Sequence, residues 1–228
     1  GQTYTDTLTV TAADGSIGNI SVQILGTNDA PTLTGVRSSF DYSESAASGI
    51  TRTQLDSNVV LSDLDSSNFD GGSLTVTINN VVAGQDQLTV LNQGTANGQI
   101  SVVGSAVSYG GVSIGTISGG TLGTPLTVSL NGNATPSAVD ALIQRVAYGN
   151  SSQLPDTTPR SITITVKDGD GTANGGTDSV SSTVNVNVIS VNDAPTFSNL
   201  SGTRAFTEGG NAVVLDSNAS LADRDLAI

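Results

Sequence analysis

The sequence matches itself at a fixed offset, and this internal repeat restricts the possible folds more than any other feature. The heptapeptide TNDAPTL at residues 27–33 returns as VNDAPTF at residues 191–197, so that Pro31 and Pro195 stand 164 positions apart. Each copy follows a segment of alternating apolar and polar residues, NISVQILG in the first case and TVNVNVIS in the second. Such alternation is typical of half-buried β-strands. The repeat therefore predicts tandem β units.

The self-match extends on both sides of the heptapeptide. Upstream, DTLTVTAADGS corresponds to RSITITVKDGDG, and the loop after the second copy is ten residues longer. Downstream, LDSNVVLSDLD corresponds to LDSNASLADRD. A proline fixes φ and cannot extend a strand ladder, so each heptapeptide suits a stiff joint between units. We expect an internal piece of a longer polypeptide in which residues 1–30 close one unit, residues 31–195 form a complete unit, and residues 196–228 open the next.

The complete unit has the pattern of an all-β structure with one helix. Strands are expected at residues 74–78, 87–91, 99–103, 106–109, 111–117, 126–130, 161–166 and 184–189, with Gly110-Gly111 as a tight hairpin turn. Between Val139 and Val146, apolar residues recur at helical spacing. Thr135 suits the N-cap, Pro136 the first turn and Gly149 the end, which predicts a short helix around residues 136–147. The expected fold is an antiparallel β-sandwich with Greek-key connections.

Composition excludes several classes of function. Seven basic and twenty acidic residues give a net charge of −13, which opposes binding to nucleic acid and to anionic membranes. The chain has no cysteine and no histidine, so disulfides, thiolate or imidazole metal sites and a Ser-His nucleophile are absent. No apolar run approaches the ~20 residues that span a bilayer. We therefore expect no enzyme and no membrane insertion, and the metals that remain are hard cations that bind oxygen.

Acidic residues recur in both copies at turns beside the joints. The candidate metal ligands are Asp14, Asp29, Glu44, Asp63, Asp65, Asp168, Asp170, Asp193, Glu208, Asp223 and Asp225. Turn residues of a sandwich collect at its two ends, where carboxylates from successive units would repel each other without a counter-charge. Ca²⁺ accepts about six to eight oxygen ligands in loose geometry, so the set predicts calcium at the joints. The alternative for each acid is a turn former that bonds its own backbone.

Two other acidic features give weaker signals. Asp70 has no counterpart in the incomplete copy and is only an additional candidate ligand. The loop DGDGTANGGTDS is not an EF-hand, because Ala173 stands at the position of the sharp-turn glycine and Ser179 at that of the terminal glutamate.

The order of these motifs resembles a known family. NDAPTF, preceded by an alternating strand with a DGDG turn and followed by FTEGG and ADRD, is similar to the cadherin-like repeats of large bacterial surface proteins and secreted adhesins. The resemblance covers most of the chain, above all residues 1–33, 40–80 and 161–228. It implies a cadherin- or immunoglobulin-like Greek key and an extracellular tandem array stiffened by Ca²⁺. The joint has one Asp where the animal cadherin motif DxNDNAPxF has two, which leaves the number of calcium ions open.

The resemblance also implies the partners, which are neighbouring repeat units and a glycan or protein receptor on a cell surface. The alternative function is a carbohydrate-binding sandwich of a secreted protein. Such sites stack aromatic rings on sugars, whereas this chain has eight aromatic residues and no Trp, and packing explains Tyr109 and Tyr148 equally well. A further hypothesis is that residues 1–30 and 196–228 pack on each other, within one chain or head to tail between chains.

Overall fold

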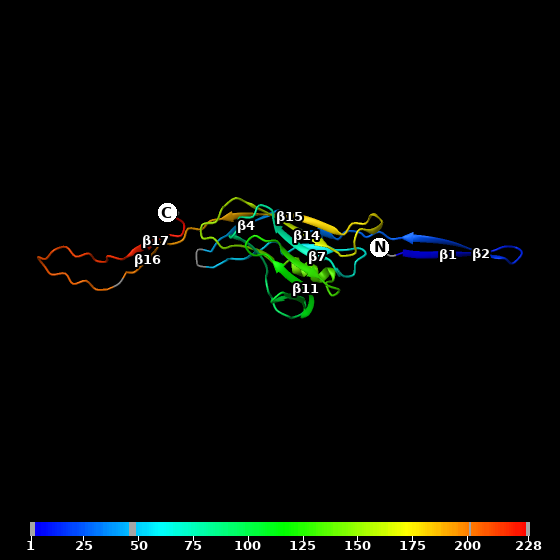
Figure 1. The fold of residues 1–228 in the computed structure, drawn as a ribbon, viewed down its shortest axis with the longest axis horizontal. Coiled ribbons are helices and arrows are strands. Elements are labelled where there is room, and N and C mark those ends of the chain that lie inside the picture. Colours follow the sequence, from blue (N-terminus) through cyan, green and yellow to red (C-terminus); the bar gives the residue numbers. More distant parts are fainter. Residues whose placement is uncertain (1–2, 46–48, 201, 227–228) are drawn as a thin grey trace.

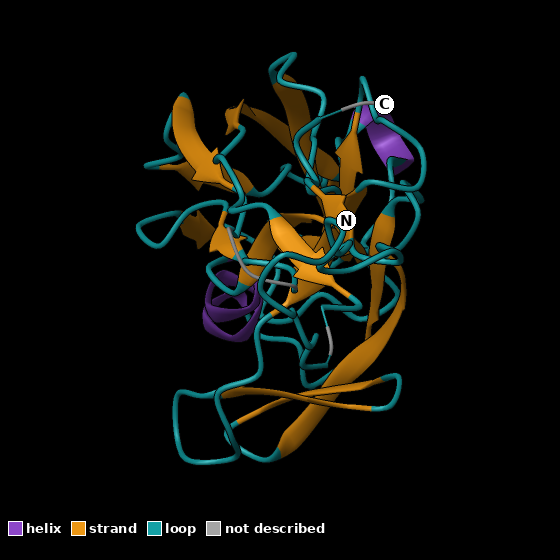
Figure 2. Ribbon diagram, turned by 90° about the vertical axis from the view of Figure 1, so that its left-hand side faces the viewer, coloured by secondary structure: helices purple, strands orange, loops and turns teal. Residues whose placement is uncertain are grey.

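The computed structural model describes residues 3–45, 49–200 and 202–226. A central body lies between two slender arms that project from its opposite ends (Figure 1). The N-terminal arm is a hairpin, the C-terminal arm doubles back towards the body, and the buried hydrophobic core extends from Phe40 to Val188. Strands make up nearly all of the regular structure, with a short helix at the flank of the body (Figure 2).

The elements follow the chain in this order. They are β1 (Thr3–Thr11), β2 (Ile17–Leu25), β3 (Thr32–Thr34), β4 (Ser39–Ser43), β5 (Thr53–Gln54), β6 (Val60–Ser62), β7 (Ser73–Ile78), β8 (Asp86–Val90), β9 (Ile100–Val103), β10 (Ala106–Tyr109), β11 (Val112–Gly119), β12 (Leu126–Leu130), α1 (Pro136–Ile143), β13 (Val146–Asn150), β14 (Arg160–Lys167), the 3₁₀ turn η1 (Ala173–Gly175), β15 (Ser179–Ile189), β16 (Thr196–Ser198) and β17 (Ser220–Ala222).

The body is a β-sandwich, which confirms the predicted fold class. Its large sheet has eight strands in the order β4-β15-β14-β7-β12-β11-β10-β9, and a second sheet has the order β5-β13-β8. The rings of Tyr42 on β4 and Tyr148 on β13 meet edge to face at 4.9 Å, so the core joins the two sheets. The pairing of β4 with β15 is parallel, whereas the other pairs are antiparallel. The large sheet is therefore mixed where a purely antiparallel one was predicted, and the second sheet is antiparallel.

Alternation in the sequence becomes alternation of burial in the central strands. In β7, Leu74, Val76 and Ile78 face the core, whereas Thr75 and Thr77 lie on the half-buried outer face. Because each fully buried aliphatic side chain contributes roughly 1.5–3 kcal/mol, this register holds the sheets together. The turn at residues 110–111 is confirmed, with both glycines at positive φ (57° and 82°), as a tight two-residue hairpin requires.

The helix begins where predicted and ends earlier. Thr135 caps α1 through its side-chain oxygen, which accepts a hydrogen bond from the Ala138 N–H at 3.3 Å. The extension to residue 147 and the helix end at Gly149 are wrong, because Val146–Asn150 form strand β13. This segment is buried along its whole length and pairs with both β5 and β8, so tertiary pairing overrides the helical periodicity. The short strands β3 to β6 were not predicted either.

One fully buried ion pair lies inside the body. The Nε atom of Arg160 lies 2.8 Å from Oδ2 of Asp86, and both side chains have no exposed surface. The Tyr148 hydroxyl and the Asn150 amide donate to Oδ1 of Asp86 at 2.6 and 3.0 Å, and the Val82 N–H donates to Oδ2 at 2.7 Å. Burial, together with donation to Asp86, raises the pKa of Tyr148 well above its ordinary value. The Asp86 charge is therefore compensated within the core.

The two arms carry strands with exposed faces. In the hairpin, β1 pairs with β2 from Thr3 opposite Leu25 to Thr11 opposite Ile17, and every residue of both strands is exposed. In the C-terminal arm the short strands β16 and β17 pair with each other and are also exposed. Among the described residues, no helix has the length and apolar character needed to cross a bilayer.

Candidate metal centre

The acids gather at two joints, one where the N-terminal hairpin meets the body and one where the body meets the C-terminal arm. The first joint comprises residues 26–31 and the second comprises residues 190–195. The first-joint cluster consists of Asn28, Asp29, Asp63, Asp65, Asp168 and Asp170, and the second-joint cluster of Glu44, Asp193, Asp223 and Asp225. Hydrogen bonds connect the residues of the first cluster to one another. In the second cluster they link Asp193 to Asp225 and Asp225 to Asp223, and they tie Glu44 to the joint backbone.

Asn28 fixes the first joint to the loop between β14 and β15. Its Nδ2 donates to Asp168 Oδ2 at 3.0 Å and to the Thr177 carbonyl at 2.6 Å, while the Thr177 N–H donates to the Asn28 carbonyl at 3.0 Å. A Cβ at Gly176 would lie 2.7 Å from the Asn28 nitrogen, so only glycine allows this approach. The loop of residues 170–178, which lies in the stretch that is ten residues longer than in the first copy, therefore clamps the joint.

Asp168 is the most buried acid of the first-joint cluster. It has no exposed surface, and its Oδ1 accepts the N–H of Asp170 at 2.8 Å. Burial raises the pKa of Asp168; hydrogen bonds from the Asp170 backbone and Asn28 oppose this shift, and the nearby carboxylates of Asp63 and Asp170 add to it. The turn needs Gly169 at φ +95°, where a Cβ would lie 2.2 Å from the Asp70 carbonyl. The raised pKa therefore reflects the burial of this carboxyl group first and the neighbouring carboxylates second.

The Asp63-x-Asp65 motif closes the first-joint cluster from the loop after β6. Asp63 Oδ1 accepts the N–H groups of Asp65 at 3.1 Å and Ser66 at 2.9 Å, as a turn-forming aspartate does. The Ser66 hydroxyl then donates to Asp170 Oδ2 at 2.7 Å, and the Asp29 N–H donates to Asp65 Oδ2 at 3.3 Å. These acids form turns and are also connected by hydrogen bonds across the joint. An acid here can therefore be both a turn former and a candidate calcium ligand.

At the second joint, Glu44 reaches back from the end of β4 to the chain that leaves β15. Its Oε1 accepts the Val191 N–H at 2.8 Å and the Ser190 hydroxyl at 3.1 Å. Two residues later Asp193 is 3% exposed, and its N–H donates to the carboxylate of Asp225 in the C-terminal arm. Glu44 of the body and Asp225 of the following arm thus each accept a hydrogen bond from the backbone of the joint.

In the part of the chain that the structure describes, buried side-chain oxygens without hydrogen-bond partners are confined to these joints. Across the described residues, the buried side-chain polar atoms that lack a partner are Asn28 Oδ1, Asp63 Oδ2, Glu44 Oε2, Asp193 Oδ1, Asp193 Oδ2 and Asp225 Oδ1. Buried polar atoms in native proteins are nearly always hydrogen-bonded, so a concentration of partnerless oxygens at two places requires an explanation.

No basic side chain supplies the missing partner. In the described part of the chain, the ion pairs join Arg160 to Asp86 and Asp156, and Lys167 to Asp178, and none of these acids belongs to either cluster. The free atoms are all oxygens, which are the donors that Ca²⁺ prefers, and Asn28 and backbone carbonyls would add neutral ligands. The donor chemistry therefore fits a hard divalent cation.

The geometry, however, is not preassembled. Within residues 3–45, 49–200 and 202–226, no three acidic side chains converge closely enough to hold a metal ion. The joints are candidate metal centres by their chemistry and burial.

Two of the predicted ligands lie away from both clusters. Asp14 is fully exposed in the turn between β1 and β2, where the hydroxyl and the backbone N–H of Ser16 bond its carboxylate and lower its pKa. It matches Asp168 in sequence, but the hairpin lacks the joint that surrounds Asp168. Glu208 matches Glu44, but it is exposed in the C-terminal arm. The sequence analysis did not predict that Asn28 and Ser66 belong to the first-joint site. Asn28 could have been found, because the NDAP motif that contains it occurs twice in the chain.

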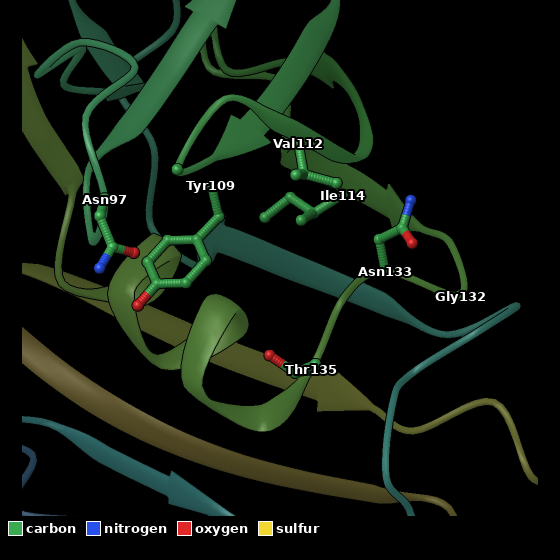
Figure 3. A pocket seen from close by; sticks show the side chains of 8 residues that line it. Asn97, Tyr109, Val112, Ile114, Gly132, Asn133 and Thr135 are labelled. Atoms are coloured by element: carbon green, nitrogen blue, oxygen red, sulfur yellow. The ribbon is translucent and has the colours of Figure 1, made fainter.

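The body also has a shallow neutral pocket of about 430 Å³. It is lined by Asn97, Tyr109, Gly110, Val112, Ile114, Gly132, Asn133 and Thr135 (Figure 3). The Tyr109 ring and the Ile114 side chain form neighbouring parts of its wall, and the Asn133 amide donates to the Ser113 carbonyl at 3.1 Å. The lining has no charged group, so the pocket offers stacking and hydrogen bonds to a ligand but no acid–base pair.

Known proteins give no family for this chain. No protein-family model matches the sequence, and no curated protein gives a significant match.

Proposed function

We propose that this chain is a calcium-binding structural and adhesive repeat of a large extracellular bacterial adhesin, in which Ca²⁺ stiffens the joints between tandem β units. One observation supports this above all: across the described residues, every buried side-chain oxygen without a partner belongs to an acid or amide at a joint. Such oxygens without a cation nearby are costly to bury, at roughly 1–3 kcal/mol each and more for charged groups.

A cation at the second joint would connect three parts of the chain. Glu44 belongs to the body, Asp193 to the joint and Asp225 to the following arm. A divalent ion that takes oxygens from all three replaces carboxylate repulsion by attraction and fixes the angle between units. At the first joint, Asn28 Oδ1 and Asp63 Oδ2 are the corresponding free oxygens.

The chemistry agrees with an extracellular setting. Calcium sites of extracellular modules bind with dissociation constants of roughly 10⁻⁴–10⁻³ M, so they would fill outside a cell and stay empty in a cytosol. The absence of cysteine and histidine leaves oxygen as the ligand for a metal. We propose neighbouring repeat units, and a glycan or protein on another cell, as the partners of the array.

Direct calcium binding tests the proposal. We expect isothermal titration calorimetry of the chelator-treated chain with CaCl₂ to give a binding curve that saturates. We also expect small-angle X-ray scattering to show that the molecules span a narrower range of lengths in calcium than in chelator. Asp193→Asn should remove or weaken one binding event. Asp14→Asn makes the same charge change at an exposed turn and should leave the titration unchanged. A flat titration, or equal effects of the two variants, would contradict the proposal.

The pocket beside Tyr109 favours one alternative, a carbohydrate-binding module. It offers one aromatic face and the side-chain amides of Asn97 and Asn133, as a site for a single sugar unit would. Glycan-array binding that disappears in Tyr109→Ala and persists in chelator would establish this function. Binding that needs calcium and survives Tyr109→Ala would assign recognition to another surface.

A further inference from the structure

The N-terminal hairpin exposes an apolar face whose counterpart is buried in the body. The self-match aligns Leu8 and Val10 with Ile162 and Ile164, and Val22 with Val186. In the body these three positions have no exposed surface, whereas in the hairpin they are 49–63% exposed. The same strand sequence therefore lacks the partner for which it is patterned.

The body also shows which strand covers the edge of the matching strand β15. Strand β15 pairs in parallel with β4, so that Val188 stands opposite Tyr42 and Asn187 opposite Asp41. The pairing continues past the strand end, where the Glu44 N–H donates to the Ile189 carbonyl at 3.2 Å. The Glu44 carboxylate then accepts the Val191 N–H.

The C-terminal arm contains a second copy of this β4 segment. Residues 203–208 align with residues 39–44, which places Phe206 at the position of Tyr42 and Glu208 at that of Glu44. Residues 203–206 have no regular secondary structure, and Phe206 is 67% exposed where Tyr42 is fully buried. The chain thus has a β15-like strand with one free edge in one arm and an unpaired β4-like segment in the other.

We propose that two copies of this chain associate head to tail, with residues 203–208 of one copy adding to the free edge of β2 in the next as a parallel strand. Transfer of the β15–β4 register sets Ile24 opposite Phe206 and Gln23 opposite Ala205. It also places the Glu208 carboxylate to accept the Thr27 N–H. Addition of a strand to an exposed edge is a common mode of recognition, because the backbone supplies the hydrogen bonds.

The association forms between copies and not within one. The two arms project from opposite ends of the body, which keeps them apart in a single chain (Figure 1). A contact between two different surfaces repeats from copy to copy and produces open chains of molecules. It is independent of the calcium proposal, since backbone pairing and apolar contacts hold it. The net charge of −13 opposes it at low salt, so a few hundred millimolar NaCl favours it.

Disulfide trapping tests the register, because the chain has no cysteine of its own. In the body, Asn187 donates to Asp41 at 2.8 Å on the outer face, so the matching residues Gln23 and Ala205 should also be adjacent. A Gln23→Cys chain mixed with an Ala205→Cys chain, with and without chelator, should form a mixed disulfide dimer under mild oxidation. Mass spectrometry of the linked peptides identifies the pair.

A shifted pair is the control. Thr203 stands two residues earlier on the same face of the added strand, so Gln23→Cys mixed with Thr203→Cys should give a several-fold lower yield. Equal yields in the two mixtures, or only homodimers in both, would overturn the proposal. So would sedimentation as a monomer at all concentrations in high salt. Trapping that succeeds equally in chelator would support this association even if calcium binding fails.

Discussion

Replacement of Glu44 by glutamine distinguishes two functions of its carboxylate, which are hydrogen bonding to the joint backbone and binding of a cation. The amide oxygen of Glu44→Gln can still accept the Val191 N–H, so the hydrogen bond at Oε1 survives. The amide nitrogen replaces Oε2, which is buried and has no partner, and one negative charge leaves a joint that also holds Asp193 and Asp225. We therefore expect the variant to be as stable as the wild type, or more stable, in chelator, and less stable than the wild type in calcium.

The size of the calcium effect follows from the expected affinity. With a dissociation constant of roughly 10⁻⁴–10⁻³ M and 10 mM Ca²⁺, one site adds about 1.4–2.7 kcal/mol to the free energy of unfolding. For a domain of this size, each kcal/mol raises Tm by roughly 2–4 °C. The wild type should thus gain about 3–10 °C per filled site. The Glu44→Gln variant should lose most of the gain that the second joint contributes.

Differential scanning calorimetry in chelator and in 10 mM CaCl₂ measures the difference in Tm between the variant and the wild type under each condition. Glu208→Gln is the matched control, because Glu208 aligns with Glu44 but is exposed in the arm, and it should change neither Tm at low protein concentration. If Glu44→Gln lowers Tm equally in chelator and in calcium, Glu44 only caps the joint through hydrogen bonds. That result would refute the reasoning about its free oxygen.

Three other substitutions test the body and the first joint. Arg160→Met leaves the buried Asp86 charge without its cation and should cost about 3–5 kcal/mol in urea unfolding, whereas the double variant with Asp86→Leu should recover part of this loss. Gly176→Ala would place a Cβ 2.7 Å from the Asn28 nitrogen, so scattering should show a looser first joint with little change in the Tm of the body. The raised pKa of Asp168 means that the native state holds its proton more tightly, so its contribution to stability falls as pH rises from 3.8 through the folded pKa. Asp168→Asn removes this fall, and in chelator the variant should gain stability relative to the wild type in urea titrations as the pH rises above 3.8.

The sequence predicted those strands in which apolar and polar residues alternate because one face is buried and the other is not. Leu74, Val76 and Ile78 alternate with threonines and form a strand with one face in the core, because a strand turns successive side chains to opposite faces. The repeat also located both joints, since proline and acids recur there. Strand β13 was missed because its residues are buried on both faces, so that no period distinguishes it from a helix end.

Amino-acid sequence alone determined the class of fold and the positions of the joints, because these depend on periodicity and on proline. The types of side chain present are also the basis for proposing an oxygen-binding cation. Which acids meet was decided by tertiary structure. Asp14 and Asp168 stand in matching turns, yet Asp14 is exposed and Asp168 is buried against Asn28, 140 positions away in the chain. Burial and the approach of distant loops set the solvation and pKa of a carboxylate, and neither is written in the residues next to it.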